Sequence, residues 1–361
     1  MNSLKTPEII PAEVPSIVSE EVRAYKVNAR NLLIPLLFSA VAFGIVTWLT
    51  YVPGMWANLA KVFKPGLLVA AILTVSLRVV IGAFRIKFVS HGRIPFVPAL
   101  RTQLVWDFYA NITPSVIGGT PFAALYMNKD QRIPLGEASG IMMFLMLLDQ
   151  IWFAVSILIM LGASMFVEII PASVGIIGEG AISLYFLAIM SWAAIFAYAT
   201  LVRPQILEWL VLKLFSLRFL SRFKARADRE MEALQARAAI IRKEKPMFFV
   251  KGVLMTASLW VCRYFLLLFV VMSITEVYNP VQIIFRAMAI LLSYIIMPTP
   301  GGAGGIEAAY TVFMTPLLGA AYVAPTLFAW RFIGFYMFII IGVFLTAKTM
   351  RDQSVRKQMG G

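Results

Sequence analysis

Long uninterrupted apolar stretches are the feature of this sequence that most restricts its fold. Six of them are near the roughly 20 residues that a helix needs to cross about 30 Å of hydrocarbon. They cover residues 32–51, 66–84, 137–162, 181–202, 247–274 and 322–347. Backbone polar groups must be paired inside a lipid bilayer, and stretches of this length pair them as helices rather than as barrel strands. We therefore expect an all-α integral membrane protein, built as a polytopic helical bundle.

The composition supports this class and excludes others. Apolar residues make up 60% of the chain and charged residues only 14%, which is unlike a soluble domain. Basic cytoplasmic loops facing anionic lipid explain the net charge of +14 better than nucleic acid does, since no basic-aromatic motif is present. The single Cys262 excludes an internal disulfide and a thiolate metal cluster, and we expect the lone His91 in a loop or at the interface. No cofactor is expected.

The distribution of Lys and Arg predicts on which side of the membrane each segment lies. Residues 1–30 and 349–361 are expected to be cytoplasmic tails, the first largely disordered, with one membrane domain, 31–348, between them. Loop 163–180 has acidic residues and no Lys or Arg, which places it outside. The residues that mark the inside include Arg85, Lys87, Arg93, Arg101, Lys129 and Arg132.

Segment 203–246 is the most basic part of the chain and is also assigned to the inside. Its apolar residues, among them Trp209, Leu210, Leu214 and Phe215, indicate an amphipathic helix at the membrane interface. A solvated helical linker is the alternative. Anionic lipid headgroups at the cytoplasmic face are its expected partners.

Two further apolar regions, 99–128 and 281–318, are broken in their middle by turn residues. The first contains TPSVIGGTP and the second PTPGGAGG. Each region is flanked on both sides by segments assigned to the same side of the membrane. We therefore expect two re-entrant hairpins of broken helices, one entering from the cytoplasm and one from outside, with both termini cytoplasmic.

The two interruptions resemble each other, which indicates an inverted repeat. TPSVIGG at 113–119 and TPGGAGG at 299–305 share Thr, Pro and the final Gly-Gly, and three spans separate them. An odd number of spans gives the copies opposite orientations, as in transporters whose binding sites form where broken helices meet. Half-helices that begin at such glycines present free N–H groups to an anion such as a lipid phosphate. The alternative is that Gly and Pro only permit close packing or a kink.

Ionisable residues at membrane depth are functional candidates, because a charge in hydrocarbon is costly. Arg78, Arg263 and Arg331 are expected to bind a phosphate in a central cavity, since a guanidinium donates two hydrogen bonds at once. The carboxylates would be counter-charges or proton carriers. The alternatives are structural ion pairs, snorkelling of Arg286 to the outer interface, and Glu307 as a helix-start residue. The candidate substrate-binding residues are Arg78, Asp107, Asn111, Thr113, Pro114, Gly118, Gly119, Asp149, Arg263, Pro300, Gly301, Gly302, Gly304, Gly305, Glu307 and Arg331.

The stretches TPGGAGGIEAAY, NITPSVIGG and LLDQ together resemble the lysylphosphatidylglycerol synthase transmembrane-domain family of flippase-like proteins. The resemblance covers about residues 30 to 347, and its most specific part is the Pro-Gly-Gly, Gly and Glu307 pattern. It implies the movement of lipids between leaflets and a bacterial plasma membrane. In the multiple peptide resistance factor proteins a soluble aminoacyltransferase domain follows. Because the last expected span ends at residue 347 of 361, we expect no such domain here.

These observations predict a transmembrane lipid translocase and not an enzyme. Its substrate would be a phospholipid or polyprenyl phosphate, moved between the leaflets of the inner membrane by rocking of the two repeats. No Gly-rich, Lys-containing nucleotide motif is present, so transport would be passive or driven by a gradient acting through Asp149 or Glu307. One alternative is a membrane-embedded lipid transferase with a carboxylate as general base. Another is a non-transporting assembly partner of a separately encoded lipid-synthesising enzyme, and a homo-oligomer would fit any of the three.

Overall fold

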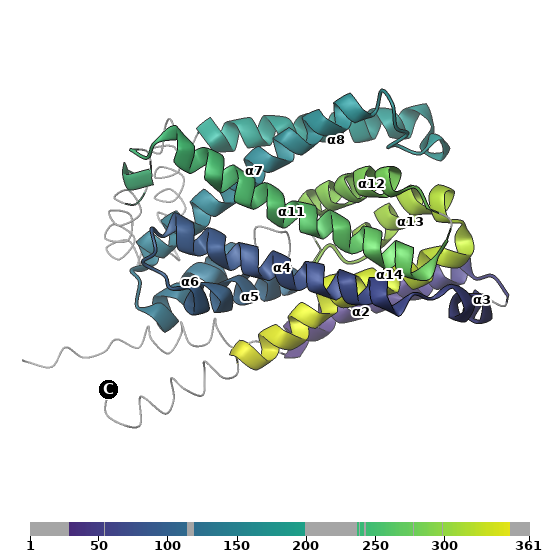
Figure 1. Ribbon diagram of the computed structural model, residues 1–361, viewed down its shortest axis with the longest axis horizontal. Coiled ribbons are helices and arrows are strands. Elements are labelled where there is room, and N and C mark those ends of the chain that lie inside the picture. The colour runs from purple at the N-terminus through teal and green to yellow at the C-terminus, as the bar shows by residue number, and fades with distance from the viewer. Residues whose placement is uncertain are drawn as a thin grey trace, which may run out of the picture.

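The computed structural model of the chain describes residues 29–346 except 54, 114–118, 199–236, 238, 242, 277 and 298. Within these residues every regular element is a helix, as the sequence predicts (Figure 1). The helices are α2 (Ala29–Thr50), α3 (Met55–Val62), α4 (Pro65–Val89), α5 (Phe96–Ile112), α6 (Gly119–Gln131), α7 (Leu135–Ala163), α8 (Gly175–Ala197), α11 (Pro246–Ile274), α12 (Pro280–Ser293), α13 (Gly305–Leu318) and α14 (Ala320–Arg331). Two 3₁₀ turns, Ala172–Val174 and Tyr294–Ile296, and a π-helical segment, Phe332–Tyr336, are also present. Residues 337–346 continue as α-helix, so α14, the π-helical segment and this continuation form one span, Ala320–Thr346. The predicted tails and nearly all of the basic segment 203–246 lie outside the described residues, so they stay predictions.

Among the residues that the structure describes, five helices are long and apolar enough to cross a membrane. They are Pro65–Val89, Leu135–Ala163, Gly178–Ala197, Pro246–Ile274 and Ala320–Thr346. A shorter apolar helix, Leu36–Thr50, coincides with the remaining predicted span. The protein is therefore a polytopic, all-α membrane protein, and this prediction is confirmed.

Prolines mark the beginnings of several helices. Pro65, Pro246 and Pro280 stand in the first turns of α4, α11 and α12, where the missing N–H costs no helical hydrogen bond. Asn279 also caps α12, because its Oδ1 accepts hydrogen bonds from two backbone N–H groups of the first turn. These local signals set the ends of the membrane helices close to where the hydropathy pattern places them.

Helices α4 and α11 lie side by side through the middle of the molecule and make its most extensive helix contact (Figure 1). Helices α7 and α8 pack together on one side of this pair, and α2 and α14 pack together on the other. The interfaces are filled by aliphatic side chains such as Leu267, Val270 and Ile290, which are fully buried. Burial of this apolar surface within the bundle fixes the positions of the few polar groups between the helices.

Two helix pairs fold back on themselves as hairpins. Helices α5 and α6 pack against each other toward one end of the molecule, and α12 and α13 toward the opposite end (Figure 1). In the second turn region, Gly301, Gly302 and Gly304 have φ angles of 60°, 64° and 87°, which residues with a side chain rarely adopt. The two predicted helix breaks are therefore present, while their re-entry into a bilayer and the sides of the termini stay predictions.

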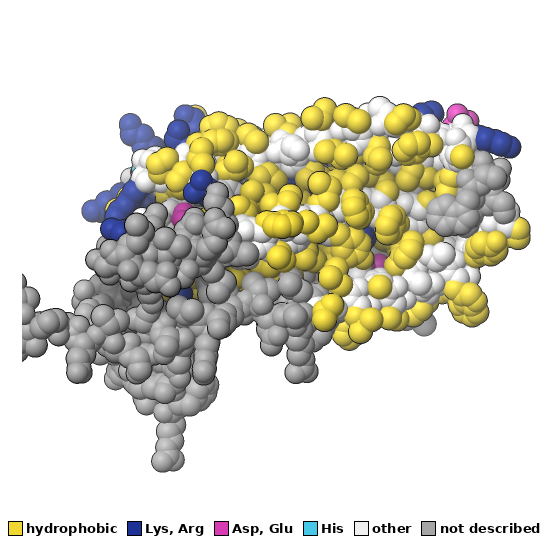
Figure 2. All heavy atoms as spheres, turned by 90° about the horizontal axis from the view of Figure 1, so that it is seen from below, with side chains coloured by type: hydrophobic (Ala, Val, Ile, Leu, Met, Phe, Trp, Pro, Cys, Tyr) yellow, Lys and Arg dark blue, Asp and Glu magenta, His cyan; other side chains and the backbone are white. Residues whose placement is uncertain are grey.

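The molecular surface has the character of a membrane protein. Figure 2 shows a broad hydrophobic face in the middle, with Lys and Arg gathered toward one end. Exposed apolar side chains on the membrane helices include Leu73, Leu77, Leu161, Leu184 and Phe344. Basic residues such as Lys87 and Arg93 lie where α4 leads into α5, whereas Glu168 and Glu276 lie in loops at the other end (Figure 1). This asymmetry has the form that the positive-inside rule requires.

Candidate functional site

The broken ends of the two hairpins meet in the interior of the molecule. Tyr294 Oη, at the end of α12, donates a hydrogen bond of 3.2 Å to the carbonyl oxygen of Ala110 in α5. Asn111 Nδ2 donates one of 3.3 Å to the carbonyl oxygen of Phe335. Gly301 packs so closely here that a Cβ atom would lie 2.8 Å from the carbonyl oxygen of Asn111. Two segments about 190 residues apart in sequence thus form one site.

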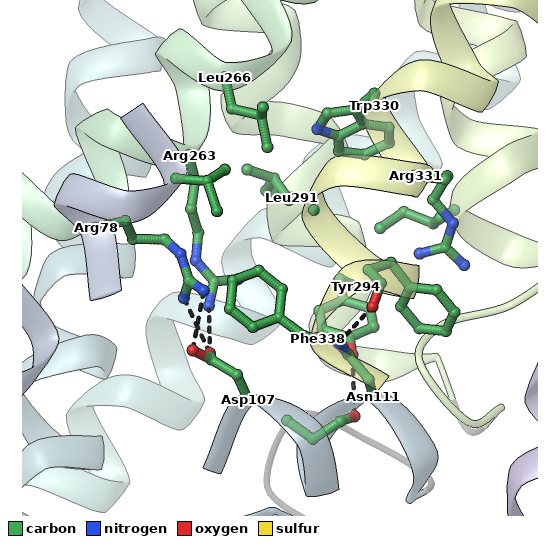
Figure 3. Close-up of a pocket in the computed structure, with 15 residues that line it drawn as sticks. Arg78, Asp107, Asn111, Arg263, Leu266, Leu291, Tyr294, Trp330, Arg331 and Phe338 are labelled. Carbon is green, nitrogen blue, oxygen red and sulfur yellow. Dashed lines mark hydrogen bonds and ion pairs between the residues drawn. The ribbon is translucent and has the colours of Figure 1, made fainter. Parts of the chain in front are cut away.

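A cavity of about 90 Å³ lies where the hairpins meet (Figure 3). Helices α4, α5, α11, α12, α13 and α14 all contribute to it. Its lining residues are Val75, Arg78, Asp107, Ala110, Asn111, Arg263, Leu266, Leu291, Tyr294, Ile306, Trp330, Arg331, Gly334, Phe335 and Phe338. Pockets for drug-sized ligands are several times larger. The cavity therefore has room for a compact polar group and not for a whole lipid.

Arg78 and Asp107 form a buried, bidentate ion pair at one side of the cavity. Arg78 Nη1 and Nη2 each donate a hydrogen bond of 2.9 Å to the two carboxylate oxygens of Asp107. Gln103 Nε2 donates a further bond of 3.1 Å. The guanidinium also lies 4.6 Å from the ring centroid of Phe338. Both side chains are less than a tenth exposed, so each neutralises the charge of the other in a low-dielectric setting.

Arg263 of α11 is the least satisfied cation of the cavity. Its Nη2 lies 3.7 Å from Asp107 Oδ1, which is close enough for an ion pair but too far for a hydrogen bond. Its Nε is buried without a hydrogen-bond partner among the described residues. The guanidinium lies 4.6 Å from the ring centroid of Trp260, and the side chain is 28% exposed. Figure 3 shows Arg78 and Arg263 both pointing toward Asp107.

Arg331 lies across the cavity from Arg78 and Arg263 and binds the second hairpin (Figure 3). Its Nε donates a hydrogen bond of 2.8 Å to Glu307 Oε1, and its two Nη atoms donate to the carbonyl oxygen of Gly301 at 3.2 and 3.3 Å. The guanidinium lies 4.1 Å from the ring centroid of Phe335. Arg331 therefore fastens α14 to the glycine turn of the hairpin.

Both carboxylate oxygens of Glu307 accept hydrogen bonds from neighbouring groups. Oε2 accepts a hydrogen bond of 2.7 Å from the N–H of Gly304 and so caps the first turn of α13. Oε1 accepts from Ser39 of α2 at 2.9 Å, in addition to Arg331. The Ser39 hydroxyl is in turn 2.6 Å from that of Tyr336. This network joins three segments distant in sequence, and the acidic side chain itself occupies the helix end where the sequence suggested an anion.

The charges around the cavity do not cancel. Arg78, Arg263 and Arg331 line it, and two carboxylates, Asp107 and Glu307, pair with them. Three cations against two anions leave one positive charge among the described residues. A buried charge of this kind favours binding of an anion, since the guanidinium must otherwise stay without a full partner.

Asp149 does not line the cavity and forms a second ion pair instead. Its Oδ1 accepts hydrogen bonds from Arg85 Nη1 at 2.7 Å and from Trp260 Nε1 at 3.0 Å. Arg85 also donates to Thr256 at 3.0 Å and is 2% exposed. The prediction that Arg85 lies in the cytoplasmic flank was wrong, because α4 continues past residue 84 to Val89. The sequence signal was the spacing of seven residues from Arg78, which puts both arginines on one helix face.

Arg286 is held inside the fold and does not snorkel. It is 2% exposed, donates a hydrogen bond of 2.7 Å to the carbonyl oxygen of Phe313, and lies 3.9 Å from Glu168 Oε1. These contacts tie α12 to α13 and to the loop after α7. Arg286 therefore has a structural role.

The remaining predicted residues shape the hairpin turns. Thr113 Oγ1 donates to the carbonyl oxygen of Tyr109 at 2.5 Å. A Cβ atom on Gly119 would lie 2.6 Å from the backbone nitrogen of Ala110, so this glycine permits α6 to touch α5. Gly302 and Gly305 similarly face Tyr294 and Met297, and Gly304 and Pro300 belong to the same turn. Pro114 and Gly118 lie outside the described residues.

Sequence reasoning missed the aromatic and polar residues that complete the site. Tyr294, Trp330, Phe335 and Phe338 line the cavity, but an aromatic residue in an apolar helix carries no signal that distinguishes it from ordinary core. Ser39 is equally unmarked in the first helix. Only their contacts with the charged groups identify them.

An apolar groove of about 650 Å³ lies beside the site, against α2, α3, α11 and α14. Its lining residues are Phe43, Leu59, Ala60, Phe63, Ile274, Pro325, Phe328 and Ala329. Ala329 lines the groove and Trp330 the cavity, so adjacent residues of α14 serve both. In Figure 2, basic and acidic side chains are also visible between the hydrophobic ones in the middle of the apolar face. Polar interior and lipid-facing surface are thus close together.

Residues 32–342 match the sequence profile of the family described as Lysylphosphatidylglycerol synthase TM region. The match covers most of the chain, including both hairpins and the whole cavity. No curated protein and no solved structure gives a significant match.

Proposed function

The chain belongs to the Lysylphosphatidylglycerol synthase TM region family, and we propose that it is a lipid translocase that moves a phosphate-containing lipid between the two leaflets of a membrane. The observation that carries the proposal is Arg263, a cation without a hydrogen-bonded carboxylate in a cavity between two broken-helix hairpins. A phosphate is the anion that a lipid presents. The guanidinium fork matches its geometry.

The position of the cavity supports transport. Binding sites where hairpins from opposite ends of a bundle meet are typical of inverted-repeat transporters, in which one repeat rocks against the other. Here the hairpin tips touch through few contacts, chiefly the hydrogen bond from Tyr294 to Ala110 and the packing of Gly301 against Asn111. Separation of the tips on one side of the cavity would open a path to one leaflet, and separation on the other side a path to the other.

In the proposed cycle, a headgroup enters laterally while its tails stay in hydrocarbon. The phosphate accepts hydrogen bonds from the N–H groups of Arg263. It is also attracted by the guanidinium of Arg78, whose charge Asp107 partly neutralises. Charge-assisted hydrogen bonds then replace the water that the phosphate loses. The groove along α14 accommodates part of a hydrocarbon chain during this step.

We further propose that the chain performs no chemistry on the lipid. A transferase would need a general base near the substrate. Asp107 and Glu307 are each held by an arginine, and Asp149 pairs with Arg85 away from the cavity. None of these three carboxylates is left free to take a proton. Binding and release without catalysis fit this arrangement better.

The proposed membrane is the bacterial inner membrane, with both termini cytoplasmic and both hairpins re-entrant. The basic end of the molecule supports this orientation, because Lys and Arg collect on the cytoplasmic side. Phospholipids and polyprenyl phosphates are the candidate substrates. Anionic lipid headgroups at the cytoplasmic face, a second copy of the chain, or a separately encoded lipid-synthesising enzyme are candidate partners.

The proposal is tested with purified protein in liposomes that contain a trace of lipid labelled on its hydrocarbon chain, an acyl chain for phospholipids and the prenyl chain for polyprenyl phosphate. A label on the headgroup would not suit, because the cavity holds only about 90 Å³. A membrane-impermeant reductant destroys label in the outer leaflet alone, so protein-dependent loss of the protected inner pool reports translocation. Wild-type protein should remove this protection and Arg263→Gln should restore it. Arg93→Gln is the control, since Arg93 pairs with Glu137 on the surface, away from the cavity. A folded wild-type protein that moves no anionic phospholipid and no polyprenyl phosphate would refute the proposal.

A further inference from the structure

The family description names an aminoacylated lipid, whose headgroup carries amino groups, so the charge of the cavity bears directly on which headgroup it accepts. A lysyl ester of phosphatidylglycerol adds two ammonium groups to one phosphate. Such a headgroup has a net positive charge. A site built for it would offer a carboxylate free to pair with an ammonium group.

The cavity offers no such carboxylate among the described residues. Both oxygens of Asp107 accept hydrogen bonds from Arg78, and Oδ2 accepts a third from Gln103. Glu307 is 1% exposed, and Arg331, Ser39 and the N–H of Gly304 occupy its oxygens. An ammonium group entering the cavity would have to displace a guanidinium from one of these pairs.

The groups that remain open are donors. Arg263 lines the cavity and is 28% exposed, and in the described part of the chain it has no hydrogen-bonded partner and its buried Nε has no acceptor. Asn111 also lines the cavity, and its Nδ2 has a second N–H beyond the one that it donates to Phe335. These donors lack a negatively charged acceptor, and a phosphate oxygen supplies one.

The size of the cavity further restricts which headgroups fit. About 90 Å³ is bounded by Leu266, Leu291, Trp330, Phe335 and Phe338. Apart from the indole N–H of Trp330, these side chains have no group that could hydrogen-bond to a sugar or to an extended lysyl chain. A compact phosphate with a small substituent fits, and its single charge balances the one uncompensated cation.

We infer that this member of the family selects a compact headgroup with one net negative charge and rejects the cationic, aminoacylated headgroup. The inference rests on the proposed function, since it assigns the substrate class of the same cavity. The possible ligands share a phosphate group, which belongs either to a lipid headgroup or to a soluble phosphate ester.

Binding is measured in detergent, apart from transport, through the fluorescence of tryptophan, because Trp260 contacts Arg263 and Trp330 lines the cavity. The probes are dihexanoyl phosphatidylglycerol, its lysyl ester, glycerol phosphate and inorganic phosphate. The phosphatidylglycerol should bind at least about tenfold more tightly than its lysyl ester, because like charges brought together oppose binding. Equal or tighter binding of the lysyl ester would overturn the inference.

The tail-less probes separate the two sources of phosphate. Binding of glycerol phosphate about tenfold weaker than that of the short-chain lipid supports a lipid headgroup as the ligand. Equal binding of both supports the anion site and assigns it to a soluble phosphate ester. Absence of saturable binding for every phosphate probe, with the protein folded, overturns the inference.

Variants of Arg263 test whether this residue sets the selectivity. Arg263→Lys should keep the preference for the anionic lipid, and Arg263→Gln should lose it while the protein remains folded. Arg263→Glu adds a carboxylate and should reverse the preference toward the lysyl ester. If Arg263→Gln retains the wild-type ratio of affinities, the inference is wrong.

The outcomes also separate this inference from the proposed function. Selective binding in detergent without movement in liposomes refutes the translocase and supports the anion-selective site. Movement of both lipids at equal rates, with equal affinities, supports the translocase and refutes the selectivity.

Discussion

The guanidinium of Arg263 lies 3.7 Å from the carboxylate of Asp107, near enough for an ion pair and too far for a hydrogen bond. Arg78 has already engaged both oxygens of that carboxylate at 2.9 Å. Asp107 therefore positions two guanidinium groups while it neutralises only one. A network that served stability alone would balance its charges, because an uncompensated buried charge is costly.

Removal of Arg263 is expected to reduce transport strongly with little effect on the fold. Arg263→Gln removes a side chain that makes no hydrogen bond among the described residues, so the free energy of unfolding should change by about 1 kcal/mol or less. Lipid movement in liposomes should fall at least about tenfold, because a hydrogen bond to a charged group contributes about 1.5 kcal/mol or more. Thermal unfolding in detergent and the reductant assay measure the two effects. Full activity of the folded variant would exclude Arg263 from the site.

Arg78, in contrast to Arg263, is expected to contribute strongly to the stability of the fold. Arg78→Ala leaves Asp107 buried without its two strongest hydrogen bonds, which costs about 3–5 kcal/mol. The double variant Arg78→Met, Asp107→Leu removes both charges and should recover most of that stability. Unfolding midpoints of the wild-type protein, the single variant and the double variant test this. A single variant as stable as the wild type would show that the pair contributes nothing to folding.

Much of the fold follows from the sequence because hydropathy and helix breakers act locally. Pro65, Pro246 and the glycines near Gly301 mark helix ends without knowledge of any partner. The pairing of charges is different, since it depends on which helices pack together. Asp149 looked like a central candidate, but α4 brings Arg85 to it and removes it from the cavity. Ser39 and Phe338 could not be identified at all, because their roles exist only in contact with Glu307 and Arg78.

Glu307 is expected to be required for stability more than for substrate binding. Glu307→Ala removes the partner of buried Arg331 and the cap of α13, and should cost about 3–5 kcal/mol. Glu307→Gln keeps one acceptor and should cost about 1–3 kcal/mol. Unfolding midpoints in detergent give both values. Glu276→Gln is the matched control, because this carboxylate is 66% exposed and its ion pair with Lys64 lies on the surface, so the substitution should be nearly neutral. Equal effects of Glu307→Ala and Glu276→Gln would contradict the structure.

The glycine turn of the second hairpin is expected to tolerate no side chain at Gly301. A Cβ atom there would overlap the ring of Phe335 and approach the carbonyl oxygen of Asn111 to 2.8 Å, and φ is 60°. Gly301→Ala should therefore separate the hairpin tips, lower the unfolding midpoint and reduce lipid movement together. Gly66→Ala is the control, because no atom lies within 4 Å of its Cβ position in the first turn of α4. The two variants should differ in both measurements, and similar behaviour would mean that the tips are not in contact.

The inverted orientation of the hairpins predicts which loops a membrane-impermeant thiol reagent reaches from outside the cell. In a Cys262→Ala background, Ser173→Cys and Glu276→Cys should be labelled in intact cells, because both residues are exposed at the end assigned to the outside. Arg93→Cys should be labelled only after the cells are opened, since it lies at the basic end. The three positions together define the topology, because α4, α7 and α11 connect the two ends. Labelling of Ser173→Cys only in opened cells would reverse the orientation of the domain. Labelling of Arg93→Cys and Ser173→Cys from the same side would remove the inverted repeat, and with it the alternating access on which the translocase depends.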